Sequence, residues 1–178
     1  MTATVTSPVS RNHNATNAAA MDALRALLES AGFTEEAVCQ RTGVASIYDF
    51  TSIREGRAPA EARDALDILI RLFLDGELLD RALIVQHLPA NAVRALESLG
   101  LLGGPAGDAS KQFATVLLYP TQGLWLISDL PVSAAGSANP LPSDAVYPAI
   151  TENTHDFISS LPRTRCERFL EMCGGTGI

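Results

Sequence analysis

Repeated helical hydrophobic spacing, interrupted by glycines, most strongly limits what this chain can fold into. Apolar residues recur every three or four positions in several segments, as in helices with one buried face. A glycine follows most of these segments, because glycine adopts the left-handed conformation after a helix without strain. The apolar positions of the first segment are Met21, Leu24, Leu27, Leu28 and Ala31. The spacing predicts helices over residues 18–31, 34–41, 60–75, 81–87 and 90–99, and therefore a largely helical domain.

Start signals accompany several of these predicted helices. Thr34 and Asp80 precede two of them and carry side-chain oxygens that can cap the free N–H groups of a first turn. Pro59 and Pro89 precede two others, and proline suits a first helical turn because its missing N–H is not needed there. These residues therefore set the predicted starts of four helices.

Two strand-like runs follow the helices. They cover residues 113–119 and 124–130, with Pro120-Thr121-Gln122-Gly123 between them as a turn, and so predict a β-hairpin. Helices followed by a hairpin resemble a winged helix-turn-helix over residues 60–130, with the helix at 90–99 in the recognition position. This likeness is architectural and rests on no diagnostic motif.

The charge of the chain disfavours nucleic acid as a partner. The formal net charge is −7, and affinity for nucleic acid depends mainly on Lys and Arg that neutralise phosphates. The predicted recognition helix offers Asn91 and Arg94, opposed by Glu97, and no basic residue lies between positions 113 and 130. We therefore expect a structural module, or one through which two copies form a homodimer.

No sequence signal directs the chain to a membrane. No apolar run approaches the roughly 18 residues that span a bilayer, and the N-terminus lacks the pattern of a signal peptide. The three cysteines and three histidines match no zinc-ligand spacing. These features predict a cytoplasmic protein with reduced thiols, no membrane contact and no metal site.

Composition divides the chain into four parts. Residues 1–17 lack periodicity and predict a flexible tail, and residues 18–130 form the helical, winged-helix-like domain. Residues 131–145 are rich in small residues and proline, as in a linker. A further domain is expected over residues 146–178, where Thr151 or Asn153 can cap a helix that ends before Pro162.

The last ten residues combine an apolar strand with a glycine-rich turn. Phe169, Leu170 and Met172 are typical of a strand buried on both faces. Glu171 interrupts this run, and a carboxylate there is costly unless a hydrogen-bond donor or a cation meets it. The residues at 173, 175 and 177 are small, so the backbone can approach a ligand closely. The pattern predicts a nucleotide-like ligand at this turn.

The same residues resemble the first motif of the class I S-adenosyl-L-methionine-dependent methyltransferases. That motif is an apolar strand followed by acid-apolar-Gly-x-Gly-x-Gly. Glu171 stands at the acid, Gly175 and Gly177 at the second and third glycines, and Cys173 replaces the first. The resemblance implies a fold that is mostly α with a winged-helix-like β-hairpin, followed by the start of an α/β Rossmann-like methyltransferase domain.

The resemblance also implies which residues bind the cofactor. Glu171 would hold the ammonium end of S-adenosylmethionine, directly or through water. The segment from Val146 to Pro148 is similar to the entry segment of such enzymes, which makes Tyr147 and Thr151 candidate pocket residues. The backbone would pass close to the methionine and ribose parts of the cofactor at Cys173, Gly174, Gly175, Thr176 and Gly177.

Two other interpretations stay open. The turn could belong to another nucleotide-binding fold, although a dinucleotide site has Gly-x-Gly-x-x-Gly after its strand, which differs from the spacing here. It could also bind no ligand, in which case the chain is a winged-helix-like binding or dimerisation module without catalytic activity.

The methyltransferase interpretation specifies the chemistry but not the acceptor. The chain would be the N-terminal part of an enzyme that transfers a methyl group by in-line displacement to a small molecule or a protein amide. Further strands, an acid for the ribose hydroxyls and the substrate-facing loop are expected downstream, so the catalytic residues are unknown. We expect residues 1–178 alone to bind S-adenosylmethionine weakly or not at all, and to be inactive.

Overall fold

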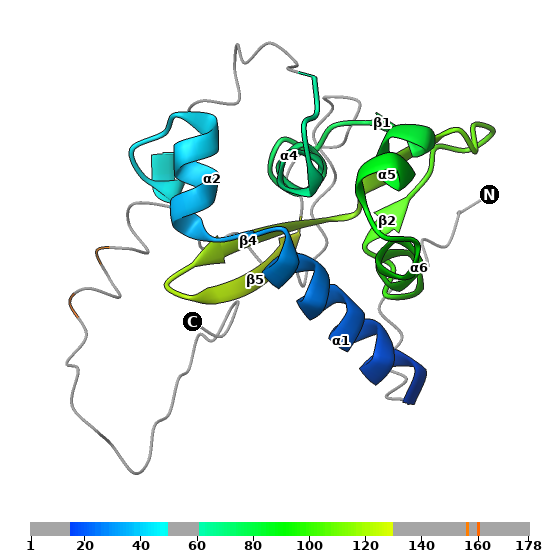
Figure 1. Ribbon diagram of the computed structural model, residues 1–178, viewed down its shortest axis with the longest axis horizontal. Helices are drawn as coiled ribbons and strands as arrows, with labels where there is room; N and C mark the ends of the chain where they lie inside the picture. The colour runs from blue at the N-terminus through cyan, green and yellow to red at the C-terminus, as the bar shows by residue number, and fades with distance from the viewer. Residues whose placement is uncertain (1–14, 50–60, 130–155, 157–159, 161–178) are drawn as a thin grey trace, which may run out of the picture.

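The computed structural model describes residues 15–49 and 61–129, together with Asp156 and Ser160. The helices are α1 (Ala15–Ser30), α2 (Glu35–Thr42), the 3-10 helix η1 (Ile47–Asp49), α4 (Ala65–Leu69), the π-helix η2 (Ile70–Leu74), α5 (Arg81–His87) and α6 (Ala90–Ser98). The strands are β1 (Leu79–Asp80), β2 (Leu102–Gly103), β3 (Lys111–Ala114), β4 (Val116–Thr121) and β5 (Leu124–Asp129). This combination of helices with small antiparallel sheets agrees with the coarse sequence prediction. In Figure 1, α4 lies between α2 and α5, and the β4–β5 hairpin runs below them.

Apolar faces hold α1 against α6. The two helices are in contact, and Leu24 and Leu28 of α1, like Val93 and Leu96 of α6, are buried. α1 begins three residues before its predicted start at 18 and ends before Gly32, whose φ of 62° gives the left-handed conformation expected after a helix. Met21 departs from the prediction, because it is 51% exposed rather than part of the buried face.

Both predicted ends of α2 are confirmed. The hydroxyl oxygen of Thr34 accepts a hydrogen bond from the N–H of Ala37 at 3.2 Å, and Gly43 follows the helix with a φ of 76°. Side chains from the β4–β5 hairpin bond to the chain just before α2, at Phe33, and after it, at Tyr48. Trp125 donates from Nε1 to the carbonyl of Phe33 at 2.8 Å, and the hydroxyls of Tyr48 and Thr121 lie 3.0 Å apart.

The single helix predicted over residues 60–75 is wrong in two respects. Residues 61–64 are not helical, and α4 starts after Asp64, whose carboxylate accepts a hydrogen bond from the N–H of Asp67 at 3.1 Å. The side chain of Asp64 thus caps the helix, and Pro59, which was expected to open it, lies outside the described residues. The helix then widens into η2, where the N–H of Asp75 bonds to the carbonyl of Ile70, five residues earlier, at 2.9 Å.

The predicted hairpin over 113–119 and 124–130 is also modified. The first run is split at Thr115, whose N–H and hydroxyl bond to the carbonyls of Leu101 and Gly100. Before this point β3 pairs with β1 and β2 in the antiparallel order β1-β3-β2, and after it β4 pairs with β5. Pro120 and Thr121 belong to β4, so the turn contains only Gln122 and Gly123.

Positive φ angles explain why this turn is so short. Gln122 has a φ of 49° and Gly123 a φ of 77°. Positive values at both central residues are typical of the two-residue turns whose twist matches that of the joined strands. The four-residue turn predicted from Pro120 to Gly123 is therefore shortened by half.

Two predicted helix starts also differ in detail. Asp80 precedes α5, but its side chain makes no cap hydrogen bond and instead lies 2.9 Å from Nζ of Lys111 across the β1–β3 pair. Pro89 occupies the cap position of α6 rather than its first turn. None of the helices in the described ranges is long and apolar enough to cross a bilayer.

Candidate functional site

The predicted cofactor site lies outside the part of the chain that the structure describes. This applies to all of its residues, which are Glu171, Cys173, Gly174, Gly175, Thr176, Gly177, Tyr147 and Thr151. The predicted linker at 131–145 lies outside it as well. Of the helix predicted to end near Leu161, Asp156 and Ser160 are described, and both are helical and exposed. The cofactor residues therefore stay a prediction from sequence.

A cluster of charged side chains joins α2 to the start of α4. Arg41 donates two hydrogen bonds to the carboxylate of Asp64, at 2.9 and 3.0 Å, and one to Oδ1 of Asp67 at 2.6 Å. The backbone N–H and Nε of Arg63 bond to Oδ2 of Asp67 at 2.9 and 3.0 Å. Asp67 is only 9% exposed. Its buried negative charge is compensated by the guanidinium groups of Arg41 and Arg63.

The environment of Asp67 keeps it ionised. Burial acts to raise the pKa of this carboxyl, but hydrogen bonds from Arg63 and Arg41 outweigh burial and lower the pKa to about 2. The pKa of Asp64 is also lowered, chiefly by its hydrogen bonds from Arg41. Because both acids are ionised and already bonded, the cluster is suited to fastening two helices rather than to transferring protons.

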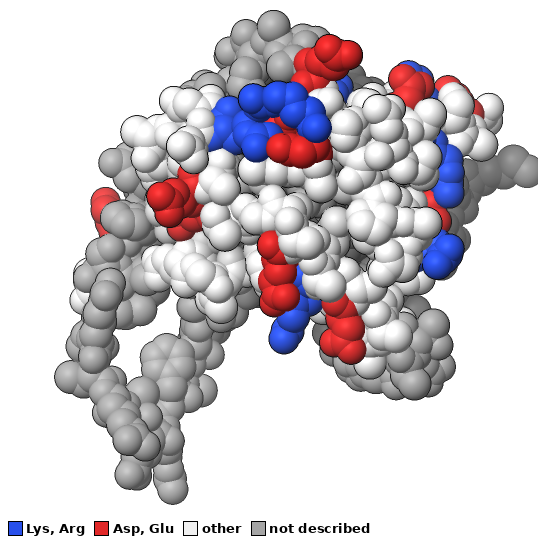
Figure 2. Space-filling view, viewed as in Figure 1, with Lys and Arg blue, Asp and Glu red and all other residues white. Residues whose placement is uncertain are grey.

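The surface around α6 does not present a basic stripe. Asn91 and Arg94 are exposed on α6, but the carboxylate of Glu97 binds Arg81 at 2.5 Å and Gln112 at 2.9 Å. The connection from β2 to β3, residues 104–110, contains Asp108 and no Lys or Arg. On the face shown in Figure 2, basic side chains lie in separate small groups, several of them next to acidic ones. These features do not favour a phosphate backbone as ligand.

Neither a metal site nor a reactive thiol is found in the described ranges. No group of three or more His, Cys, Asp or Glu side chains there is arranged to hold a metal ion. Cys39 is a free, partly buried cysteine, and burial, with smaller effects of Glu35 and Asp49, raises the pKa of its thiol. The thiol form, which is the weaker nucleophile, is therefore favoured at Cys39.

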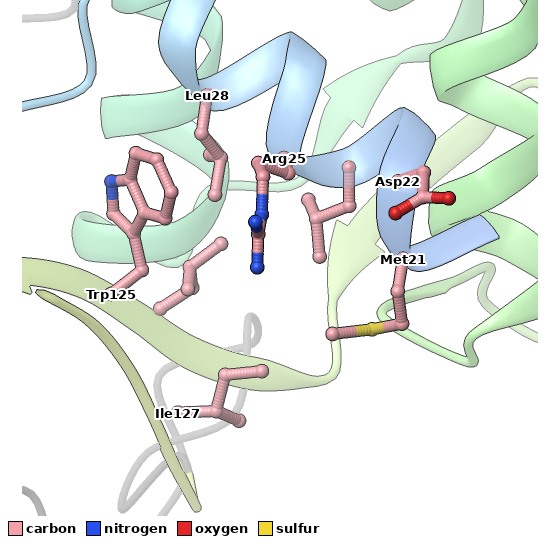
Figure 3. A pocket seen from close by; sticks show the side chains of 8 residues that line it. Met21, Asp22, Arg25, Leu28, Trp125 and Ile127 are labelled. Carbon is pink, nitrogen blue, oxygen red and sulfur yellow. The ribbon is translucent and has the colours of Figure 1, made fainter. Parts of the chain in front are cut away.

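An apolar groove lies between α1 and the β4–β5 hairpin. Its volume is about 210 Å³. Its apolar lining consists of Met21, Leu24 and Leu28 from α1, Leu118 from β4, and Trp125 and Ile127 from β5. Asp22 and Arg25 of α1 complete the lining, and Figure 3 shows the guanidinium of Arg25 extending into the space between Trp125 and Met21. The groove thus combines an aromatic surface with one cation, Arg25, and one carboxylate, Asp22.

Sequence reasoning missed both the charged cluster and the groove. The sequence contains one signal for each. Asp67 is an acid between apolar neighbours, and Arg25 is a basic residue four positions after the apolar Met21. Neither signal identifies the partner, because Arg41 and Trp125 come from distant parts of the chain.

Comparison with known proteins leaves the function open. No protein-family model, curated protein or solved structure matches this chain. The function must therefore be inferred from the residues themselves.

Proposed function

We propose that this chain carries the first cofactor-binding motif of an S-adenosylmethionine-dependent methyltransferase, preceded by a helical module. The observation that supports this is the succession of an apolar strand, Glu171, and the small residues Cys173, Gly175 and Gly177. In this proposal Glu171 meets the ammonium group of the cofactor. The small residues let the backbone lie against the rest of the ligand.

The proposed reaction needs little covalent chemistry from the protein. When bound, S-adenosylmethionine would supply a methyl group from its sulfonium sulfur. The acceptor would gain this methyl group and release a proton to solvent, and the neutral thioether S-adenosylhomocysteine would be the other product. The protein supplies orientation and exclusion of water. A small molecule and a protein amide are the proposed acceptor classes.

For the helical module we propose a winged-helix-like arrangement with a structural role. Two features support this assignment. The elements follow one another as α4–η2, β1, α5, α6, β2 and β3, and the strands pair in the order β1-β3-β2. In this proposal the wing is the β2–β3 connection rather than the hairpin of β4 and β5, and that hairpin extends the module toward α1 and α2. Because Glu97 and Asp108 add negative charge where a DNA reader needs cations, we assign the module to support or pairing of the enzyme rather than to DNA.

Replacing Glu171 with Gln tests the proposed cofactor contact. In the product of the whole reading frame that encodes these residues, Glu171→Gln should weaken S-adenosylmethionine binding about tenfold or more, since a hydrogen bond to a charged group contributes about 1.5–3 kcal/mol. Calorimetric titration measures this directly. Glu29→Gln is the matched control, because Glu29 is exposed on α1 and the chemical change is the same.

Equal affinity of the two variants would contradict the assignment of Glu171. Absence of binding by the unsubstituted protein would favour the alternative, a winged-helix-like binding or dimerisation module without catalytic activity. A gel-shift assay with duplex DNA and light scattering would then separate DNA binding from formation of a homodimer.

A further inference from the structure

We propose that the groove between α1 and the β4–β5 hairpin binds a small aromatic acid, with its ring against Trp125 and its anionic group at Arg25. This inference uses residues of the helical module alone and does not depend on the methyltransferase proposal. It requires an accessible apolar surface, a cation without a partner and a space of suitable size.

The apolar walls of the groove are both accessible and positioned. Met21 is 51% exposed and Ile127 is 41% exposed, although both are large apolar side chains. The indole of Trp125 is held by its hydrogen bond to the carbonyl of Phe33, and in Figure 3 its nitrogen points away from the groove. The carbon edge of a fixed indole therefore faces the open space, as in sites that pack aromatic rings.

Arg25 supplies a cation that the described residues leave unpaired. No hydrogen bond or ion pair joins it to another residue in the described ranges, and this includes Asp22, which lies one turn earlier on α1. Arg41, Arg63, Arg71, Arg81 and Lys111, in contrast, all have carboxylate partners. A guanidinium binds a carboxylate or sulfonate through paired N–H groups and also stacks on aromatic rings. Arg25 thus complements an acid with an aromatic body.

The size of the groove favours a compact ligand over a macromolecule. Its volume of about 210 Å³ is below the range of about 300–1,000 Å³ typical of pockets for drug-sized molecules. A helix, with a diameter of about 10–12 Å including its side chains, needs a longer and wider groove. One or two fused rings with an acidic substituent fit the space and its chemistry.

Fluorescence provides a direct test, because Trp125 is the only tryptophan in the chain. The probe is 5-(dimethylamino)naphthalene-1-sulfonate, an anion with two fused aromatic rings that accepts excitation energy from tryptophan. We expect one probe per chain to bind and to quench the emission of Trp125. Arg25→Gln should weaken this binding about fivefold, as for a partly exposed charged pair. Arg25→Lys should weaken it less, because lysine keeps the charge but lacks the paired N–H groups. Arg94→Gln, which removes an exposed arginine from α6, should leave it unchanged.

A neutral probe separates the charge contribution from general apolar binding. N,N-dimethyl-1-naphthylamine has the same aromatic body without the sulfonate, so its affinity should be the same before and after Arg25→Gln. Equal affinity of the anionic probe for Arg25→Gln and the unsubstituted chain would overturn the proposal. So would probe binding without quenching of Trp125. The proposal would also be overturned if neither the probe nor acrylamide quenched the emission of Trp125. That result would show that another part of the chain or a second copy fills the groove. Measurement of the molecular mass in solution by light scattering would distinguish these two cases.

Discussion

Replacing Leu72 with Ala should lower the free energy of unfolding by about 2–5 kcal/mol, the usual cost of a Leu to Ala change in a packed core. Leu72 is fully buried in η2, which packs against α4, β3 and β4. The transfer free energy of the removed atoms is lost, and the cavity left behind removes packing contacts from the side chains that line it. Urea denaturation of the 178-residue chain, followed by circular dichroism, should show a lower midpoint with an unchanged slope.

Leu124→Ala is the matched control for this prediction. It makes the same chemical change at a side chain that is 53% exposed at the hairpin turn. The expected loss is about 0.5 kcal/mol or less. Similar midpoints for the two variants would mean that η2 does not form the centre of the core.

Replacing Asp67 with Asn should destabilise the chain by about 2 kcal/mol at pH 7, because the pKa of Asp67 is lowered from its ordinary 3.8 to about 2. In the folded state the carboxylate of Asp67 binds a proton less tightly than in the unfolded state. Ionised Asp67 therefore stabilises the fold fully above about pH 4, and this contribution is lost as the pH falls toward about 2. Asn keeps the shape but removes the charge that faces Arg41 and Arg63.

The pH dependence distinguishes this effect from a packing defect. Urea midpoints should differ between Asp67→Asn and the unsubstituted chain at pH 7 and converge as the pH falls below about 4. Asp22→Asn is the control, since Asp22 is exposed and no ion pair joins it to the described residues. A difference between Asp67→Asn and the unsubstituted chain that is constant from pH 7 to pH 3 would rule out the ion pairs as its cause.

Local signals in the sequence predicted those elements whose ends depend on nearby residues. Thr34 and Gly43 bound α2 as expected, because a cap and a left-handed glycine act within a few residues. The start of the helix predicted over 60–75 was wrong because Asp64, a local cap, was not recognised. Arg41, from a distant part of the chain, then holds Asp64 and Asp67 in place. The strand after Phe113 changes partners at Thr115 because of distant contacts, since Gly100 and Leu101 bind it.

The candidate sites differ in how far sequence could predict them. The cofactor motif is contiguous, so residues 169–177 suffice to propose it without a fold. The groove depends on how closely α1 approaches the hairpin, which no local pattern contains. Met21 illustrates this: its helical spacing matches a buried face, but the packing of α1 leaves it at the edge of the groove.

Mapping the S-adenosylmethionine contact tests the central claim most directly. The product of the whole reading frame should be cross-linked by ultraviolet light to S-adenosylmethionine that carries tritium on its methyl group. It should then be digested with trypsin, which cleaves after Arg168 and releases a peptide that begins at Phe169. We predict that this peptide carries the label and that excess unlabelled S-adenosylmethionine prevents the labelling. Label confined to peptides from residues 15–129, or labelling that unlabelled cofactor does not reduce, would contradict the assignment of residues 169–177 as a methyltransferase motif.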